Sequence, residues 1–164
     1  MNQRSRLGVL FLTMLAAVCA AEKSAKPARS AASFEKACSA GKIADCVELG
    51  SLYVNGQGVN VDVRKAAEFY RRACDKKSND GCVRLGALYE TGLGVPKDGK
   101  KAAALYGEAC SRGFSRACTS LGSLYAYGRA GTEKNPRKAA EYYGEACRLD
   151  GAASCYLKDL YDKQ

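Results

Sequence analysis

Residues 82–110 read CVRLGALYETGLGVPKDGKKAAALYGEAC, and similar stretches begin at Cys46 and Cys118. The copies follow one another with a period of 36 residues, and the third copy has one extra residue between Gly128 and Asn135. A fixed period of this length is typical of repeat proteins, in which each unit packs on its neighbours. The fold therefore follows from the pattern within one unit.

Each unit contains two segments with helical periodicity. In the first, Leu85, Leu88 and Tyr89 recur at the spacing of one helix face. Gly92 follows as a left-handed helix end, and Asp98 precedes the second segment as an N-cap. The spacing predicts first helices at about 46–55, 82–91 and 118–127. The inner faces of the second helices are expected to consist of small and aromatic residues: Ala66, Tyr70, Ala73, Ala102, Tyr106, Ala109, Ala139, Tyr143 and Ala146.

A glycine recurs in the middle of each first helix, at positions 50, 86 and 122. Glycine inside a helix costs roughly 1 kcal/mol relative to alanine. Its recurrence predicts a close approach of the partner helix at this point.

Half units flank the three full ones. Residues 34–38 match the end of a second helix, and residues 155–164 match the start of a first helix, with Lys158 and Asp159 in place of the Leu-Gly pair. A polar end of this kind is typical of a solenoid cap. The sequence thus predicts an all-α fold, a right-handed α/α solenoid over residues 34–164. Its full repeats are expected at about 46–81, 82–117 and 118–154.

The cysteines follow the repeat. Eight of the nine form pairs eight residues apart, in which the first ends a second helix and the second opens the next first helix. A short turn between antiparallel helices brings such positions close enough for a disulfide. The predicted bridges are Cys38–Cys46, Cys74–Cys82, Cys110–Cys118 and Cys147–Cys155.

The N-terminus carries the features of an export signal over residues 1–20. A basic start precedes an apolar run that is too short to span a bilayer, and Val18 and Ala20 stand at the −3 and −1 positions of a cleavage site before Ala21. Cleavage there would leave an even number of cysteines in an oxidising compartment, either the periplasm or the extracellular space. Acylation at Cys19, as in a lipoprotein, is the alternative. Residues 21–33 are expected to form a flexible linker.

The pattern LGxLYxxGxGVxxDxxKAAxxYxxA resembles the Sel1-like repeat, a relative of the tetratricopeptide repeat. With its fixed cysteine pairs, the chain resembles the secreted cysteine-rich subclass typified by the Helicobacter cysteine-rich proteins. The Gly128 to Asn135 loop departs from that pattern, because Ala130-Gly131 stands where the other units have Gly-x-Gly-Val. The resemblance implies a protein-binding scaffold, and also raises β-lactam binding or hydrolysis, an activity commonly attributed to this subclass.

The residues themselves argue against catalysis. The chain has no histidine, so a Ser–His or Cys–His nucleophile and a histidine metal site are absent. The serine β-lactamase motif S-x-x-K occurs at Ser33–Lys36 and Ser39–Lys42, without the SDN and KTG motifs that accompany it. We therefore expect no catalytic residue, metal or cofactor.

The net charge of +9 falls to +7 without residues 1–20, which hold two of the basic residues and no acidic ones. A basic exported protein could bind an anionic envelope polymer as a structural component, whereas no motif indicates nucleic acid. Basic pairs at 64–65, 100–101 and 137–138 predict either a basic ridge or lysine stems lying over the core.

The preferred interpretation is a non-catalytic scaffold, monomeric and without a membrane span, that binds a protein or peptide. In tetratricopeptide-like geometry the first helices line the concave side, and the small, mostly uncharged residues there suit an extended peptide or a partner helix. The candidate ligand-binding residues are Val47, Ser51, Val54, Val83, Ala87, Glu90, Thr119, Ser123, Ala126 and Tyr127.

Overall fold

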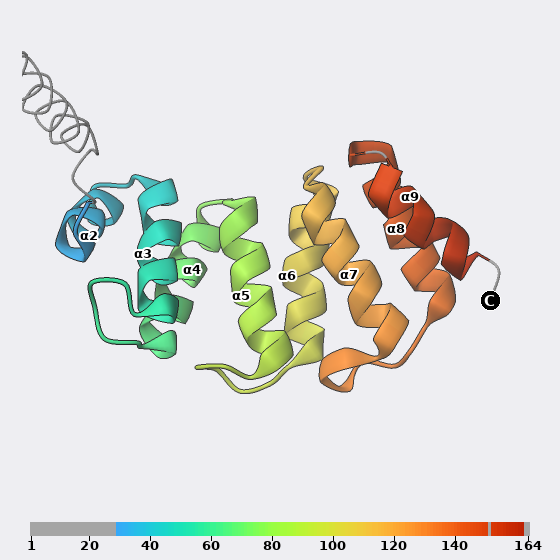
Figure 1. Ribbon diagram of the computed structural model, residues 1–164, viewed down its shortest axis with the longest axis horizontal. Helices are drawn as coiled ribbons and strands as arrows, with labels where there is room; N and C mark the ends of the chain where they lie inside the picture. Colours follow the sequence, from blue (N-terminus) through green and yellow to red (C-terminus); the bar gives the residue numbers. More distant parts are fainter. Residues whose placement is uncertain (1–28, 151, 163–164) are drawn as a thin grey trace, which may run out of the picture.

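The computed structural model describes residues 29–150 and 152–162, and the regular secondary structure in this part of the chain consists of helices alone (Figure 1). The predicted signal segment 1–20 and linker residues 21–28 lie outside the described residues. The eight α-helices are α2 (Ala31–Ser39), α3 (Ile43–Asn55), α4 (Val63–Asp75), α5 (Asn79–Thr91), α6 (Gly99–Ser111), α7 (Ser115–Tyr127), α8 (Pro136–Asp150) and α9 (Ala152–Tyr161). No helix in the described ranges combines the length and apolar character needed to cross a bilayer.

The helices pack as consecutive antiparallel pairs along the long axis of the molecule (Figure 1). The first helix of each repeat is called an A helix here (α3, α5, α7 and, as a half unit, α9), and the second a B helix (α2, as a half unit, α4, α6 and α8). Each of the three full A helices contacts the B helices before and after it in the chain, and α9 contacts α8. The predicted all-α solenoid of helix pairs is thereby confirmed.

Local signals fix most helix ends. The B helices α4 and α6 begin after Asp62 and Asp98, whose carboxylates accept hydrogen bonds from backbone N–H groups three residues on, both at 3.0 Å. Each full A helix ends at a left-handed glycine, with φ of +80° at Gly92. The A-helix starts differ from expectation, because each lies three residues before its cysteine. In α5, Ser78 caps this extra turn by accepting a hydrogen bond from the N–H of Gly81 at 3.2 Å.

The core is built where a B-helix tyrosine crosses the glycine of its A helix. Tyr106 of α6 is buried against Gly86 of α5, and Tyr70 with Gly50 and Tyr143 with Gly122 repeat the arrangement. The hydroxyl group of each tyrosine forms a hydrogen bond with a side chain of the A helix. The predicted close approach at these glycines is confirmed.

Four disulfides join each B helix to the next A helix, in the predicted pairing. The Cα separations are 4.5–4.7 Å, within the range that a disulfide requires. Cys38 and Cys46 tie α2 to α3, although α2 begins at Ala31, inside the expected linker 21–33. Arg29 fixes this first helix by pairing with Asp45 and by stacking on Phe34 at 4.2 Å.

Candidate functional site

An open pocket of about 400 Å³ lies on the side formed by the A helices α5, α7 and α9. It is called the A-helix pocket below. Four of its residues recur at helical spacing on α7 and so form one face of that helix. Glu90 comes from the end of α5, Arg129 from the 3-10 turn Arg129–Gly131, and two residues from the α8–α9 junction. The lining residues are Glu90, Arg116, Thr119, Ser120, Ser123, Arg129, Asp150 and Ser154.

Glu90 is the central charged group of the pocket, with its side chain only 16% exposed. Its Oε2 accepts a hydrogen bond from the Tyr106 hydroxyl at 2.9 Å, and its Oε1 pairs with Arg129 Nη1 at 3.0 Å. Burial raises the pKa of Tyr106, and the negative charge of Glu90 raises it further. The phenol therefore stays protonated and donates its hydrogen to Glu90 throughout the physiological pH range.

Hydroxyl groups make up the rest of the pocket wall. Thr119 Oγ1 lies 3.3 Å from Ser154 Oγ, which links α7 to α9. Ser123 Oγ lies 3.0 Å from the hydroxyl of Tyr143. Asp150 accepts a hydrogen bond from the hydroxyl of Ser115. These contacts hold three helices together and leave a polar surface that can hydrogen-bond a ligand.

The second repeat departs from the other two at this pocket. In the first and third repeats, Ser51 and Ser123 lie within hydrogen-bonding distance of the buried tyrosine hydroxyl, at 3.3 and 3.0 Å. Ala87 replaces that serine in the second repeat, and the carboxylate of Glu90 takes over as acceptor. The positions equivalent to Glu90 are occupied by Val54 and Ala126. The exchange places a charged group where the other repeats have an apolar one.

The ten candidate residues fall into three groups. Val47, Val83 and Ala126 are buried in core clusters that include residues of the following repeat, so they offer no surface to a partner. Ser51, Val54, Ala87 and Tyr127 are half-buried or exposed outside the A-helix pocket. Glu90, Thr119 and Ser123 lie together in the pocket. Sequence reasoning missed the other lining residues: Arg116, Ser120, Arg129, Asp150 and Ser154.

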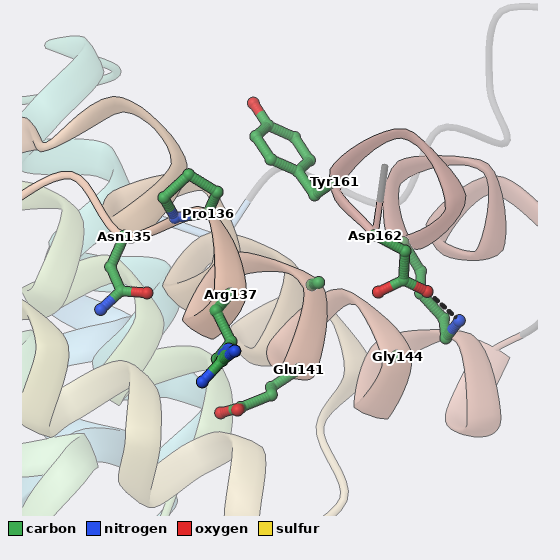
Figure 2. A pocket seen from close by; sticks show the side chains of 9 residues that line it. Asn135, Pro136, Arg137, Glu141, Gly144, Tyr161 and Asp162 are labelled. Carbon is green, nitrogen blue, oxygen red and sulfur yellow. Dashed lines mark hydrogen bonds and ion pairs between the residues drawn. The ribbon is translucent and has the colours of Figure 1, made fainter. Parts of the chain in front are cut away.

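A larger cavity of about 660 Å³ lies between α8 and α9 (Figure 2). It occupies the place where a further B helix would pack if the repeat continued. Lys158 and Asp162 line it and form an ion pair, whereas the third repeat has Leu121 and Tyr125 at these positions. Its other lining residues are Asn135, Pro136, Arg137, Ala140, Glu141, Gly144 and Tyr161. This cavity corresponds to a surface on which helices pack elsewhere in the solenoid, with polar residues in place of apolar ones. We therefore take the A-helix pocket as the candidate site.

The second residues of the basic pairs lie over tyrosine rings. The Nζ atoms of the three lysines are 5.0–5.4 Å from the ring centres of A-helix tyrosines, a cation–π geometry. The pairs are Lys65 with Tyr53, Lys101 with Tyr89, and Lys138 with Tyr125. The observed geometry matches the alternative in which lysine stems cover the core.

One group of metal-type ligand atoms occurs in the described ranges, formed by Cys74, Cys82 and Glu108. Its two sulfurs are joined in a disulfide, which removes the thiolates that a metal would need. Hydrogen bonds from Lys77 and Arg112, both accepted by Oε1, lower the pKa of Glu108. The group thus serves as a contact between repeats.

The two S-x-x-K serines, Ser33 and Ser39, are exposed on α2, at the far end of the molecule from α7 and α9 (Figure 1). We expect the purified protein not to hydrolyse a chromogenic β-lactam above the buffer rate. Steady hydrolysis that copurifies with the chain and disappears in Ser33→Ala or Ser39→Ala would contradict this expectation.

The helix pairs and their bridges define a disulfide-linked helical repeat protein. The Sel1 repeat family model matches residues 44–78, 79–114 and 115–151, each starting within one residue of an A helix. The chain belongs to the Sel1 repeat family. The resemblance stated from the sequence is confirmed, whereas comparison with curated proteins by sequence gave no significant match.

Similar solved structures include three helical repeat proteins. A protective antigen of uropathogenic Escherichia coli with an SLR fold is 25% identical, with a TM-score of 0.72 over 81% of this chain. A Sel1 repeat protein from Oxalobacter formigenes is 28% identical, with a TM-score of 0.71 over 78%. Helicobacter pylori cysteine rich protein B is 28% identical, with a TM-score of 0.60 over 80% of this chain and 99% of its own. The chain spans only 29% of the first protein and 52% of the second.

Proposed function

We propose that the protein is an exported, non-catalytic scaffold that binds an extended segment or a helix of a partner protein on its A-helix face. Support comes mainly from one observation: three A helices contribute polar side chains to a single open pocket. Recognition by a surface shared between repeats is the usual mode of solenoid proteins. The four disulfides fit an oxidising compartment, either the periplasm or the extracellular space.

A pocket-filling substitution tests this proposal. Ser120 lines the pocket on the solvent side of α7, and its hydroxyl bonds only to the backbone of its own helix at Arg116. We expect Ser120→Trp to leave the fold intact and to weaken binding of a partner isolated from envelope extracts by roughly tenfold or more, since a tenfold loss needs only about 1.4 kcal/mol. Isothermal titration with the purified partner measures the change.

The matched control is Ala104→Trp, an equally large ring placed on the exposed side of the B helix α6. It should bind the partner as the unmodified protein does, and both variants should keep the far-UV circular dichroism spectrum. Loss of binding in Ala104→Trp with normal binding in Ser120→Trp would assign the partner to the B-helix face and refute the proposal.

A further inference from the structure

The A-helix pocket has free N–H donors on two arginines beside two carboxylates that already accept hydrogen bonds. Both oxygens of Glu90 accept bonds from within the chain, and Asp150 accepts one from Ser115. Arg129 uses Nη1 on Glu90 and remains 51% exposed. Arg116 is 65% exposed and reaches Asp80 at 3.8 Å, which is too long for a hydrogen bond. Because a guanidinium carries five N–H donors, both arginines have donors left for a ligand.

Two separate departures from the repeat pattern contact each other at the A-helix pocket. The first is Ala87 in α5, which stands where the other repeats have serine. In the absence of that serine, the Glu90 carboxylate accepts the hydrogen bond of the Tyr106 hydroxyl. The second is the loop with the extra residue, in which Ala130 takes a positive φ of 55° and the turn carries Arg129 to Glu90. The other two repeats have Gln57 or Leu93 directly after the capping glycine. Glu90 thus orients the one arginine that the irregular loop supplies.

We propose that this pocket binds a carboxylate of the partner, between the guanidinium groups of Arg116 and Arg129 and beside the hydroxyls of Thr119 and Ser120. The inference rests on the proposed function, since it names the chemistry of the segment that the scaffold binds. A carboxylate offers acceptors only, and arginine donates to it in charge-assisted and often bidentate hydrogen bonds. The carboxylate belongs either to an acidic side chain or to the C-terminus of a chain, and the test separates these two sources.

The probes are three short acetylated peptides of glycine and serine. The first has a central glutamate and an amidated C-terminus, the second has glutamine in place of the glutamate, and the third is the glutamine peptide with a free C-terminal carboxylate. Each is titrated into the full, oxidised ¹⁵N-labelled protein, and the backbone amide shifts of α7 and of Arg129 are followed by NMR. We expect the glutamate peptide to shift these amides and the amidated glutamine peptide to bind about tenfold more weakly, as loss of a charged hydrogen bond predicts.

Variants then assign the effect to the two arginines. Arg129→Gln and Arg116→Gln should each weaken the glutamate peptide by roughly tenfold. The matched control is Arg64→Gln, which removes the same charge from an exposed position on α4 and should leave binding unchanged. An equal loss in Arg64→Gln would mean that net charge attracts the peptide, and it would overturn the proposal.

The remaining outcomes separate this inference from the proposed function. Equal binding of the glutamate peptide and the amidated glutamine peptide would refute the carboxylate site and leave the peptide scaffold standing. Shifts with the free C-terminus alone would support the site and assign the carboxylate to a chain end. If no peptide shifts the α7 amides, the carboxylate site is wrong, and the partner titration with Ser120→Trp then decides the scaffold separately.

Discussion

Replacing Cys74 and Cys82 together by alanine is expected to lower the free energy of unfolding by roughly 2–4 kcal/mol. The bridge closes a loop of eight residues, and the chain-entropy model assigns about 2.5 kcal/mol to a loop of that size. Both sulfurs are also buried between α4 and α5, so their contacts are lost as well. Urea unfolding followed by far-UV circular dichroism measures the loss.

Reduction of all four bridges should have a larger effect. Four such losses sum to roughly 10 kcal/mol at most, since loss of a terminal bridge acts on its own helix, and this sum is comparable to the whole stability of a typical domain. The reduced protein is therefore expected to be unfolded at 37 °C, whereas the oxidised protein melts cooperatively. A reduced protein whose melting midpoint lies within a few degrees of the oxidised one would show that the A–B helix contacts suffice without the bridges.

The end of the array provides the control. The Cys147–Cys155 bridge ties α9 to α8, and α9 has no further B helix packed on it in the described part of the chain. In a solenoid each unit is stabilised by its neighbours, so damage at an end stays local. The double alanine variant at this bridge should thus release α9 alone, seen as hydrogen exchange confined to residues 152–162, and leave the main transition almost unchanged.

The helix ends that the sequence predicts correctly are those set by interactions within a few residues. Asp98 and Gly92 act on the backbone within a few residues, and the helices begin and end beside them as expected. The start of α5 was expected at Cys82 but lies at Asn79. The added turn also occurs in α3 and α7, where Asp45 and Ala117 are buried at the position of Gly81. Gly81 itself is helical and buried. A Cβ there would lie 2.7 Å from the Cβ of Ala73 on α4, a tertiary contact that no local pattern reveals.

The pocket could be predicted only in part. Glu90, Thr119 and Ser123 follow from the A-helix face expected for two successive repeats, whereas Arg129 and Asp150 reach the pocket from other segments. Alignment of the repeats does contain a signal for the site, since Ala87 and Glu90 break the pattern together. The burial of Val47 and Val83 gives no such signal, because it depends on how closely successive repeats pack.

Alanine at Gly86 is expected to destabilise the protein by roughly 1–3 kcal/mol, although alanine is the better helix former. A Cβ at this position would lie 2.6 Å from Cε1 of Tyr106, closer than side-chain atoms approach. The ring cannot move away easily, because Tyr106 is 2% exposed and its hydroxyl is bonded to Glu90. The cost of overpacking therefore exceeds the gain in helix propensity of about 1 kcal/mol.

Gly107 is the matched control for this substitution. It also lies inside a helix, on α6, but a Cβ there would meet only Cδ2 of Leu121 at 3.8 Å, an ordinary contact. Gly107→Ala should therefore stabilise the protein by roughly 0.5–1 kcal/mol, so the two variants should change stability in opposite directions. Urea unfolding of both proteins measures the difference. If Gly86→Ala stabilises as much as Gly107→Ala, Tyr106 can shift within the core, and the close crossing of α5 and α6 does not require the glycine.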